Sequence, residues 1–139
     1  MSSSKIYQIK SEDQIGGFAK SFISDLKHNL VLFIGDLGAG KTTIIKALLK
    51  ELGSEDIGSS PSYAIINKYI ADQGPVFHID LYRLNTAEEV FQLGIEEILY
   101  ADNKCFMEWP QLIIDYIDPP YHTVKIEVLE DNSRKISML

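Results

Sequence analysis

The fold of this chain is decided by the stretch Leu30–Thr43, which reads LVLFIGDLGAGKTT. Its first five residues are apolar, a pattern typical of a strand that is buried on both faces at the centre of a parallel sheet. Three glycines follow within six residues, and a lysine and two threonines come directly after them. Because glycine has no side chain to hold the backbone away from a ligand, this pattern predicts a loop that brings its N–H groups close to an anion.

Four residues in this stretch match the phosphate-binding loop (P-loop) pattern G-x-x-x-x-G-K-[ST], namely Gly35, Gly40, Lys41 and Thr42. The helix predicted to follow adds unpaired N–H groups and about half a positive charge at its N-terminus. We expect Lys41 to reach the β- and γ-phosphates of a nucleotide and Thr42 to place its hydroxyl on Mg²⁺. A plain glycine-rich turn is the alternative, but the strand before the loop and the helix after it favour nucleotide binding. We also expect phosphate contacts from Gly38, Ala39 and Thr43.

Two acidic residues stand at the ends of predicted strands. Asp80 ends the run VFHID, and Glu108 ends the run KCFME. The carboxyl ends of parallel strands form the ligand crevice of an open α/β sheet, so both acids face the phosphates if these strands run parallel to LVLFI. Considered alone, each acid fits equally well the alternative of an ordinary solvent-exposed residue at the end of a strand. His78 shares a strand face with Asp80, where it is placed to orient that acid or the attacking water. Such a histidine is more often a hydrogen-bonded packing residue, so we do not assign it a catalytic role.

The predicted chemistry is Mg²⁺-dependent ATP hydrolysis. Loop amides, Lys41 and the metal ion neutralise charge on the transferring phosphoryl group. Mg²⁺ prefers oxygen ligands, which Thr42 and Glu108 offer. Asp80 either supports the ligands of the metal or orients the attacking water, and the sequence leaves both roles open.

The choice of nucleotide and reaction rests on what the chain lacks. A GTPase is expected to carry the base-reading pattern N-K-x-D, but the two NK pairs here continue to Ile70 and Phe106 in place of the aspartate, which favours ATP. A small-molecule kinase usually has a lid that carries arginines. The only arginines of the chain are Arg83 and Arg134, which weakens the kinase alternative without excluding it.

Composition sets the outer limits. The 139 residues are 45% hydrophobic and 24% charged, which suits one soluble domain over residues 1–139. The net charge of −7 argues against a protein that holds nucleic acid alone, although a local basic patch stays possible. The single cysteine, Cys105, is expected to be a core thiol. No signal-peptide core or membrane span of about 20 apolar residues is visible, so we expect a cytoplasmic protein.

Elsewhere the chain alternates between period-two and helical patterns. Ser11 with Gln14 and Thr86 with Glu89 form capping-box patterns at the start of two helices, and Gly94 is a point at which the second can break. Strands are predicted at 5–9, 30–34, 63–70, 76–80, 104–108, 122–129 and 134–139, and helices at 11–26, 41–52, 86–100 and 110–117. These elements predict an α/β, P-loop NTPase-like layered fold with a mixed, mostly parallel central sheet flanked by helices.

The ordered set of motifs GDLGAGKTT, SPSY, HIDLYRL and EWPQ resembles the TsaE family, also called YjeE. Members of that family are bacterial ATPases needed to make threonylcarbamoyladenosine on tRNA. The motifs run from Gly35 to Gln111, about half of the chain, and the length and order of the elements fit throughout. The phosphate loop alone is generic, so the other three motifs make the resemblance specific.

The resemblance implies roles for single residues. Lys41 and Thr42 match the phosphate-binding lysine and the Mg²⁺-binding threonine of the family. Asp80 matches its Walker B-like aspartate. Glu108 matches its metal-associated glutamate, and Trp109 matches the adjacent tryptophan.

Three further residues follow by weaker correspondence. The run SPSY, Ser60–Tyr63, matches a switch-like loop that usually reads S-P-T. Here Ser62 replaces the threonine, which keeps a hydroxyl for nucleotide sensing but loses a methyl contact. Ser11 and Arg134 are placed beside the nucleotide by analogy alone.

The resemblance also implies partners. Family members work with two proteins, TsaD and TsaB, which transfer the threonylcarbamoyl group to tRNA, and ATP hydrolysis resets or activates that complex between turnovers. The acidic net charge agrees with contact to tRNA only through the partners. Reasoning from the residues leaves two other classes open, a nucleotide-gated binding module and a small-molecule kinase.

Overall fold

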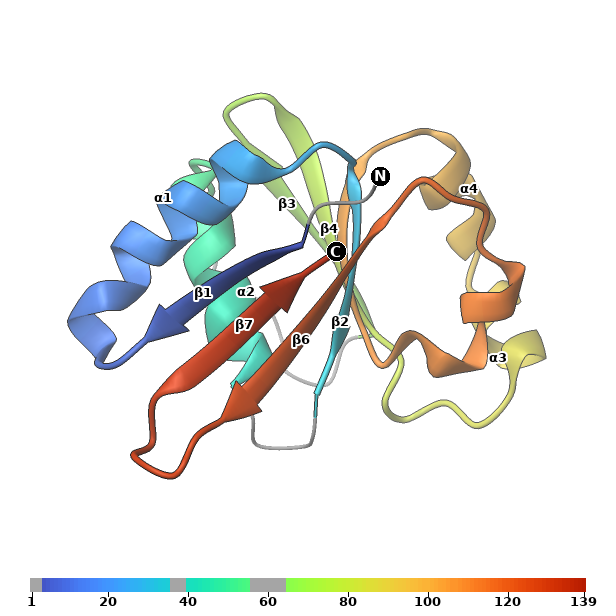
Figure 1. Ribbon diagram of the computed structural model, residues 1–139. Coiled ribbons are helices and arrows are strands. Elements are labelled where there is room, and N and C mark those ends of the chain that lie inside the picture. The colour runs from blue at the N-terminus through green and yellow to red at the C-terminus, as the bar shows by residue number, and fades with distance from the viewer. Residues whose placement is uncertain (1–3, 36–39, 56–64) are drawn as a thin grey trace.

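The computed structural model describes residues 4–35, 40–55 and 65–139. In this part of the chain, strands form one seven-stranded sheet in the order β1-β7-β6-β2-β5-β4-β3 (Figure 1). The strands are β1 (Lys5–Ile9), β2 (Leu30–Ile34), β3 (Ile66–Ala71), β4 (Gly74–Asp80), β5 (Lys104–Glu108), β6 (His122–Val128) and β7 (Arg134–Met138). The stretch LVLFI is therefore the middle strand, as its apolar run predicted.

The sheet is mixed. β2 pairs in parallel with β5 and β6, and β4 pairs in parallel with β5. The outer pairs, β1 with β7, β6 with β7 and β3 with β4, are antiparallel. Thus β1, β2, β4, β5 and β6 run in one direction, and β3 and β7 run in the other. This confirms the predicted mostly parallel sheet and its closing hairpin.

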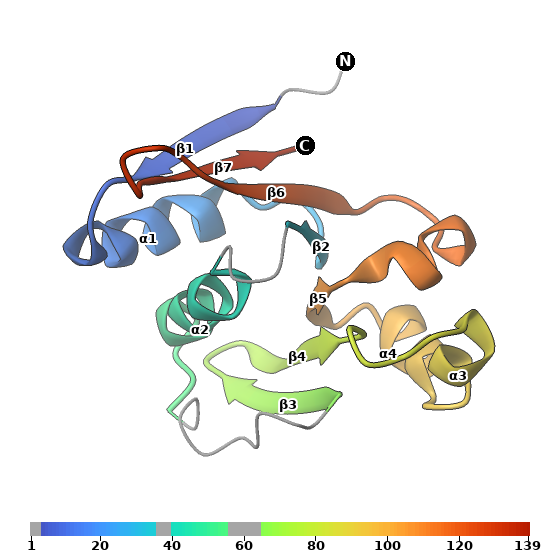
Figure 2. The same cartoon turned by 90° about the horizontal axis from the view of Figure 1, so that it is seen from below.

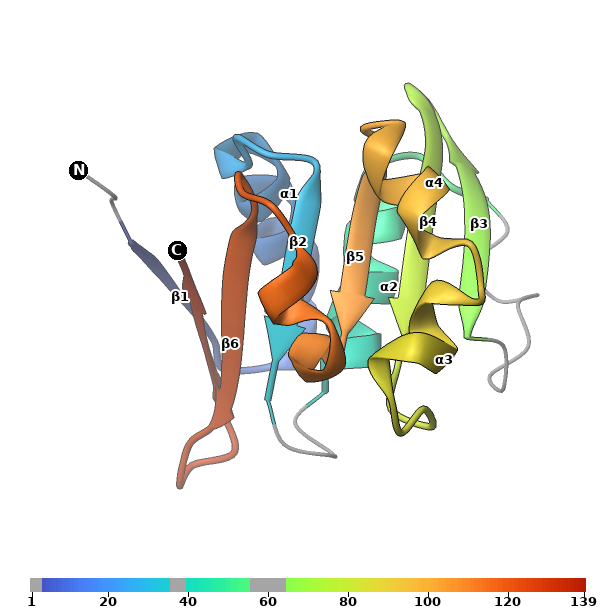
Figure 3. The ribbon, with the colours of Figure 1, turned by 90° about the vertical axis from the view of Figure 1, so that its right-hand side faces the viewer.

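Helices cover both faces of the sheet (Figures 2 and 3). One face carries α1 (Ile15–Asp25) and α2 (Lys41–Glu51), and the other carries α3 (Ala87–Phe91), α4 (Ile95–Tyr100) and the 3₁₀ turns η3 (Pro110–Leu112) and η4 (Ile114–Tyr116). A further 3₁₀ turn, η1 (Glu12–Gln14), precedes α1. In the described residues, no helix is long and apolar enough to cross a membrane.

The central strand joins two hydrophobic clusters. Val31 and Phe33 point into the cluster under α1 and α2, while Leu32 points into the cluster under α3 and α4, and all three are fully buried. Cys105 belongs to the second cluster, and burial raises the pKa of its thiol to about 12. The predicted core thiol is therefore confirmed, because Cys105 is fully buried among apolar side chains.

Two of the predicted helix signals form as expected. The Thr86 hydroxyl accepts a hydrogen bond from the Glu89 N–H, and the Glu89 carboxylate accepts one from the Thr86 N–H, which completes the capping box of α3. Gly94, at a φ of 79°, separates α3 from α4. Gly53, at a φ of 95°, ends α2 in the left-handed conformation that favours glycine.

Two expectations are corrected. The capping box predicted at Ser11 does not form. The Ser11 side chain caps no N–H group and donates instead to the Asp13 carboxylate, and the Gln14 side chain accepts from the Lys10 N–H at 2.8 Å in place of the Ser11 N–H. The helix predicted at 110–117 is two 3₁₀ turns, because Ile113 takes a non-helical φ of −126° between them. The strand predicted at 63–70 begins at Ile66 in the described residues, and residues 63 and 64 lie outside them.

A buried histidine ties the entry of β2 to the C-terminal end of the chain. His122 Nε2 accepts hydrogen bonds from the N–H groups of Lys27 and His28, at 2.9 and 3.1 Å. Its Nδ1 donates to the Leu139 carbonyl at 3.0 Å. An Nε2 that accepts two N–H groups must be unprotonated, so the ring is neutral. Burial, helped by the nearby charges of His28, Lys27 and Lys104, lowers the pKa of His122 despite the opposing bond to Leu139.

We therefore predict a stability change tied to His122. Because its pKa is lower in the folded state, the unfolded chain binds the proton first, and the free energy of unfolding falls as the pH drops below about 6.5. His122→Gln, which retains an acceptor, should flatten this fall between pH about 7.5 and about 5.5 in urea denaturation. His28→Gln is the control and should keep most of the fall in the free energy of unfolding. Equal slopes for the wild type and His122→Gln would contradict the assignment.

Candidate functional site

The loop after β2 leads into α2 as the motif requires. Gly40 is the residue before α2 and takes a φ of 91°, a conformation that side chains other than hydrogen rarely tolerate. Its carbonyl accepts the N–H of Ile44 at 3.0 Å, which starts the helical ladder. A Cβ at Gly40 would lie 3.6 Å from Arg134 Nε, so the strand β7 comes close to the loop. Gly38 and Ala39 lie outside the described residues.

Lys41 is buried at the start of α2, with 5% of its surface exposed. Its Nζ donates to the Gly35 carbonyl at 2.5 Å and lies 3.6 Å from the centroid of the Trp109 ring. A lysine ammonium over an indole face is a cation–π contact. The ammonium is therefore held between the end of β2 and the residue that follows β5.

Three side chains meet on the other side of the α2 N-terminus. Thr42 Oγ1 lies 3.3 Å from both carboxylate oxygens of Glu108. His78 Nε2 lies 2.6 Å from Glu108 Oε2. Glu108 and His78 are 2% and 8% exposed. The carboxylate therefore joins α2, β4 and β5 in one buried polar network.

Asp80 stands beside this network at the end of β4. It is the register partner of Glu108 across the parallel strands, and its Oδ1 accepts the Tyr82 N–H at 3.1 Å. Burial raises the pKa of the Asp80 carboxyl, and the Glu108 charge adds to this effect. The Tyr82 hydrogen bond and the charges of His78 and Lys41 act in the opposite direction.

A cavity of about 420 Å³ opens between these elements. Its lining residues are Gly40, Lys41, Thr42, Thr43, Asp80, Tyr82, Glu108, Trp109 and Arg134. The structure thus brings together seven of the predicted site residues from β4, β5, β7 and the start of α2. An eighth, Gly35, accepts the hydrogen bond of the Lys41 ammonium through its carbonyl.

Ser11 and Ser62 are placed differently. Ser11 is not among the described residues that line the cavity, and its hydroxyl donates to Asp13. It follows β1, whose last residue, Ile9, pairs with Arg134. Ser62 lies outside the described residues, as does the rest of the SPSY run.

Sequence reasoning missed two features of the site. Tyr82 lines the cavity, is 52% exposed, and has its ring centroid 5.1 Å from that of Trp109. The partner of His78 is Glu108 on the neighbouring strand, whereas the sequence pointed to Asp80. Tyr82 had a local signal, because it follows Asp80 by two residues. The contact between His78 and Glu108 had none, because it depends on the pairing of β4 with β5.

The donor set fits a magnesium ion. Thr42, Asp80 and Glu108 offer a hydroxyl and two carboxylates, and all of these are oxygen ligands of the kind Mg²⁺ takes. Among the residues that the structure describes, no three His, Cys, Asp or Glu side chains form a group able to hold a metal by themselves.

Comparisons with known proteins agree with this architecture. A crystal structure of YdiB from Bacillus subtilis superposes with a TM-score of 0.73 at 27% identity, over 99% of this chain and 86% of that one. Proteins named tRNA threonylcarbamoyladenosine biosynthesis protein TsaE are also similar. Those of Rickettsia conorii and Rickettsia bellii are each 35% identical, over 96% and 91% of this chain and 77% and 88% of their own.

The similarity extends to a further bacterial protein and to the family as a whole. The protein of the same name from Borreliella burgdorferi is 36% identical over 81% of this chain and 82% of its own. The family model described as "Threonylcarbamoyl adenosine biosynthesis protein TsaE" matches residues 9–136, almost the whole chain. The chain therefore belongs to the TsaE family.

Proposed function

We propose that this protein is a Mg²⁺-dependent ATPase that acts in the biosynthesis of threonylcarbamoyladenosine on tRNA. Membership of the TsaE family supports the pathway. One observation carries the chemistry: at the N-terminus of α2, the Thr42 hydroxyl faces the buried Glu108 carboxylate beside Lys41. A hydroxyl, a carboxylate and an ammonium at a helix N-terminus suit a nucleotide triphosphate with its metal ion.

Phosphate binding is the task of the loop and of Lys41. The N–H groups at the start of α2 and the dipole of this eleven-residue helix attract the phosphates. Lys41 exchanges its contact with the Gly35 carbonyl for a contact with phosphate oxygens, which are stronger acceptors because they are charged. Arg134, which also lines the cavity and comes close to Gly40, adds a second positive charge.

The residues that act in hydrolysis are those around the Glu108 carboxylate. Thr42 and Glu108 would hold Mg²⁺, which supplies neutralisation of charge on the phosphates. His78 fixes one oxygen of Glu108 and so holds the carboxylate toward Thr42. Two roles fit Asp80, orientation of the attacking water and support of the metal ligands, because it is the partner of Glu108 in the strand register.

The proposed setting is the cytoplasm, in a complex with TsaD-like and TsaB-like proteins. The net charge of −7 supports contact with tRNA through these partners and not directly, because an acidic protein repels the phosphate backbone. In this setting hydrolysis resets or activates the partner complex.

The first test removes the lysine. Lys41→Ala should lower the affinity for ATP by at least about tenfold, because a charge-assisted contact with phosphate is worth about 1.5–3 kcal/mol. Titration calorimetry on the folded variant measures this. Lys46→Ala, an exposed lysine on the same helix, is the control and should bind ATP as the wild type does. Unchanged affinity in Lys41→Ala would refute the phosphate-binding role of the loop.

The second test separates hydrolysis from binding. Glu108→Gln and Asp80→Asn should each reduce Mg²⁺-dependent phosphate release at least about tenfold, since each removes a carboxylate charge from the site. ATP should still bind, because the loop amides and Lys41 remain. Multiple-turnover phosphate release is measured with and without the purified partners, and Glu97→Gln, an exposed carboxylate on α4, is the control. A variant that keeps full activity would show that the substituted residue has no catalytic role. If the wild type binds ATP but releases no phosphate with or without the partners, the protein is a nucleotide-gated switch and not an enzyme.

A further inference from the structure

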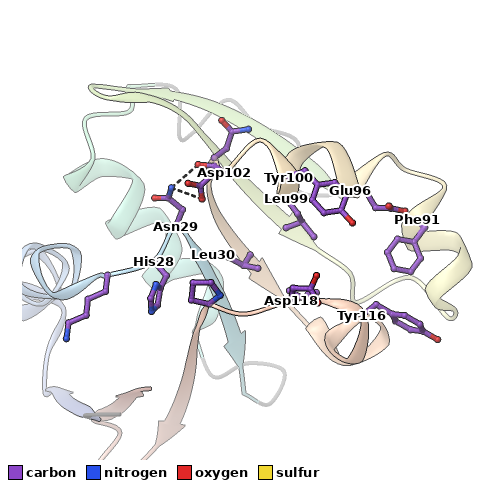
Figure 4. Close-up of a pocket in the computed structure, with 14 residues that line it drawn as sticks. His28, Asn29, Leu30, Phe91, Glu96, Leu99, Tyr100, Asp102, Tyr116 and Asp118 are labelled. Carbon is purple, nitrogen blue, oxygen red and sulfur yellow. Dashed lines mark hydrogen bonds between the residues drawn. The ribbon is translucent and has the colours of Figure 1, made fainter. Parts of the chain in front are cut away.

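A second cavity, larger than the first, lies at the opposite end of the sheet. It measures about 620 Å³ and sits where β2 and β5 begin, on the face that carries α3 and α4 (Figure 4). In Figure 4 Leu99 and Tyr100 project from α4, Leu30 lies at the start of β2, and Tyr116 and Asp118 come from the segment before β6. We call this cavity the α4 groove. β2 separates it from the phosphate loop by its five residues, about 17 Å.

About half of the lining of the α4 groove is apolar or aromatic, and this half includes exposed aromatic rings. Phe91, Leu99 and Ile117 line it and are only partly buried. Tyr100 and Tyr116 are 79% and 66% exposed, unusually high for large side chains beside a partly apolar cavity. Tyr116 packs edge-on against Phe91, with ring centroids 5.6 Å apart, so its ring is held in place. Exposed tyrosines beside a partly apolar cavity, one of them held by a ring contact, are typical of the anchor points of protein–protein interfaces.

The rim of the α4 groove is acidic. Glu96, Asp102 and Asp118 line it, against one lysine, Lys27. The segment 86–118, which builds most of this face, holds eight acidic residues and one lysine, a balance of −7 that equals the net charge of the whole chain. The rest of the chain has twelve residues of each sign. One of the eight acidic residues of the segment, Glu108, is buried in the proposed nucleotide site, and three, Glu96, Asp102 and Asp118, line the groove. The excess of negative charge therefore lies in the segment that supplies most of the groove.

We propose that the α4 groove binds a segment of a partner protein in which lysine or arginine side chains stand among apolar ones. The apolar part of the lining and the two tyrosines supply the contact area, and the acidic rim selects positive charge and speeds encounter. A second copy of this chain would bring a net charge of −7 to an acidic surface, and nucleic acid would bring phosphates. The proposal is independent of ATP binding, because the groove and the phosphate loop lie at opposite ends of β2.

The test uses two fluorescent peptides as probes, one of alternating leucine and lysine and one of alternating leucine and glutamate. Anisotropy titrations with the full chain should give saturable binding of the lysine peptide alone, and added salt should weaken it. The double variant Glu96→Lys with Asp118→Lys should bind at least about tenfold more weakly. The matched control Glu51→Lys with Glu130→Lys changes the net charge equally at exposed sites outside the groove, and should bind as the wild type does.

Two more variants guard the interpretation. Tyr100→Ser removes an exposed ring without a change of charge, and it should weaken binding of the lysine peptide. The control Ile70→Ser, at a 62% exposed residue of β3, should leave that binding unchanged. Lys41→Ala should bind the peptide as the wild type does, whatever its affinity for ATP. The proposal is overturned if the lysine peptide does not saturate, if the glutamate peptide binds as well, or if the control pair loses as much affinity as the groove pair. It is also overturned if light scattering shows a dimer that the groove variants dissociate, since the occupant is then a second copy.

Discussion

A carboxylate that is almost fully buried is the constraint on which the rest of this structure depends. Glu108 is 2% exposed, and burial of an unpaired carboxylate costs several kcal/mol. The chain meets this cost with the hydroxyl of Thr42 from α2 and the ring of His78 from β4. For both groups to reach Glu108, the loop after β2 must start α2 directly above the end of β5, and β4 must pair with β5 in its observed register. The position of one charge therefore fixes the relative placement of the loop, the helix and two strands.

The same arrangement supports the proposed binding of phosphate and metal at the carboxyl ends of the parallel strands. Lys41, one residue before Thr42, is turned toward Gly35 and Trp109, while Thr42 is turned toward Glu108. The helix N-terminus thus carries an ammonium on one side and a hydroxyl with a carboxylate on the other. An ammonium and a helix dipole attract phosphate, and the oxygen ligands attract Mg²⁺. The α4 groove lies at the opposite end of the strands, so the nucleotide site and the partner site that we propose are separate surfaces at the two ends of β2.

Local rules predicted most of the fold. The apolar run of β2, the glycine at position 40 and the capping box at Thr86 each act within a few residues, and each formed as expected. The box predicted at Ser11 did not form, since the Gln14 side chain accepts from the Lys10 N–H and the Ser11 side chain caps no N–H group. What the sequence could not give was set by long-range pairing. The contact of His78 with Glu108 depends on the register of β4 with β5.

The α4 groove depends likewise on where the segment before β6 packs, and no local pattern encodes that packing. Its charge, by contrast, comes from acidic residues that are spread through the sequence between positions 86 and 118. Asp80 shows both what the sequence predicts and what only the folded chain determines. The strand pattern placed Asp80 at the correct edge, but its raised pKa arises from burial and from the neighbouring Glu108, which only the folded chain brings together.

The central claim is that Lys41 and Glu108 form one nucleotide site, and Trp109 reports on both. It is the only tryptophan, it follows Glu108 directly, and the Lys41 ammonium lies 3.6 Å from its ring centroid. When ATP and Mg²⁺ bind, Lys41 should leave the ring for phosphate, and the emission of Trp109 should shift, with a smaller shift for ATP and a chelator. A spectrum that stays flat at saturating nucleotide, with binding confirmed by calorimetry, would contradict the account.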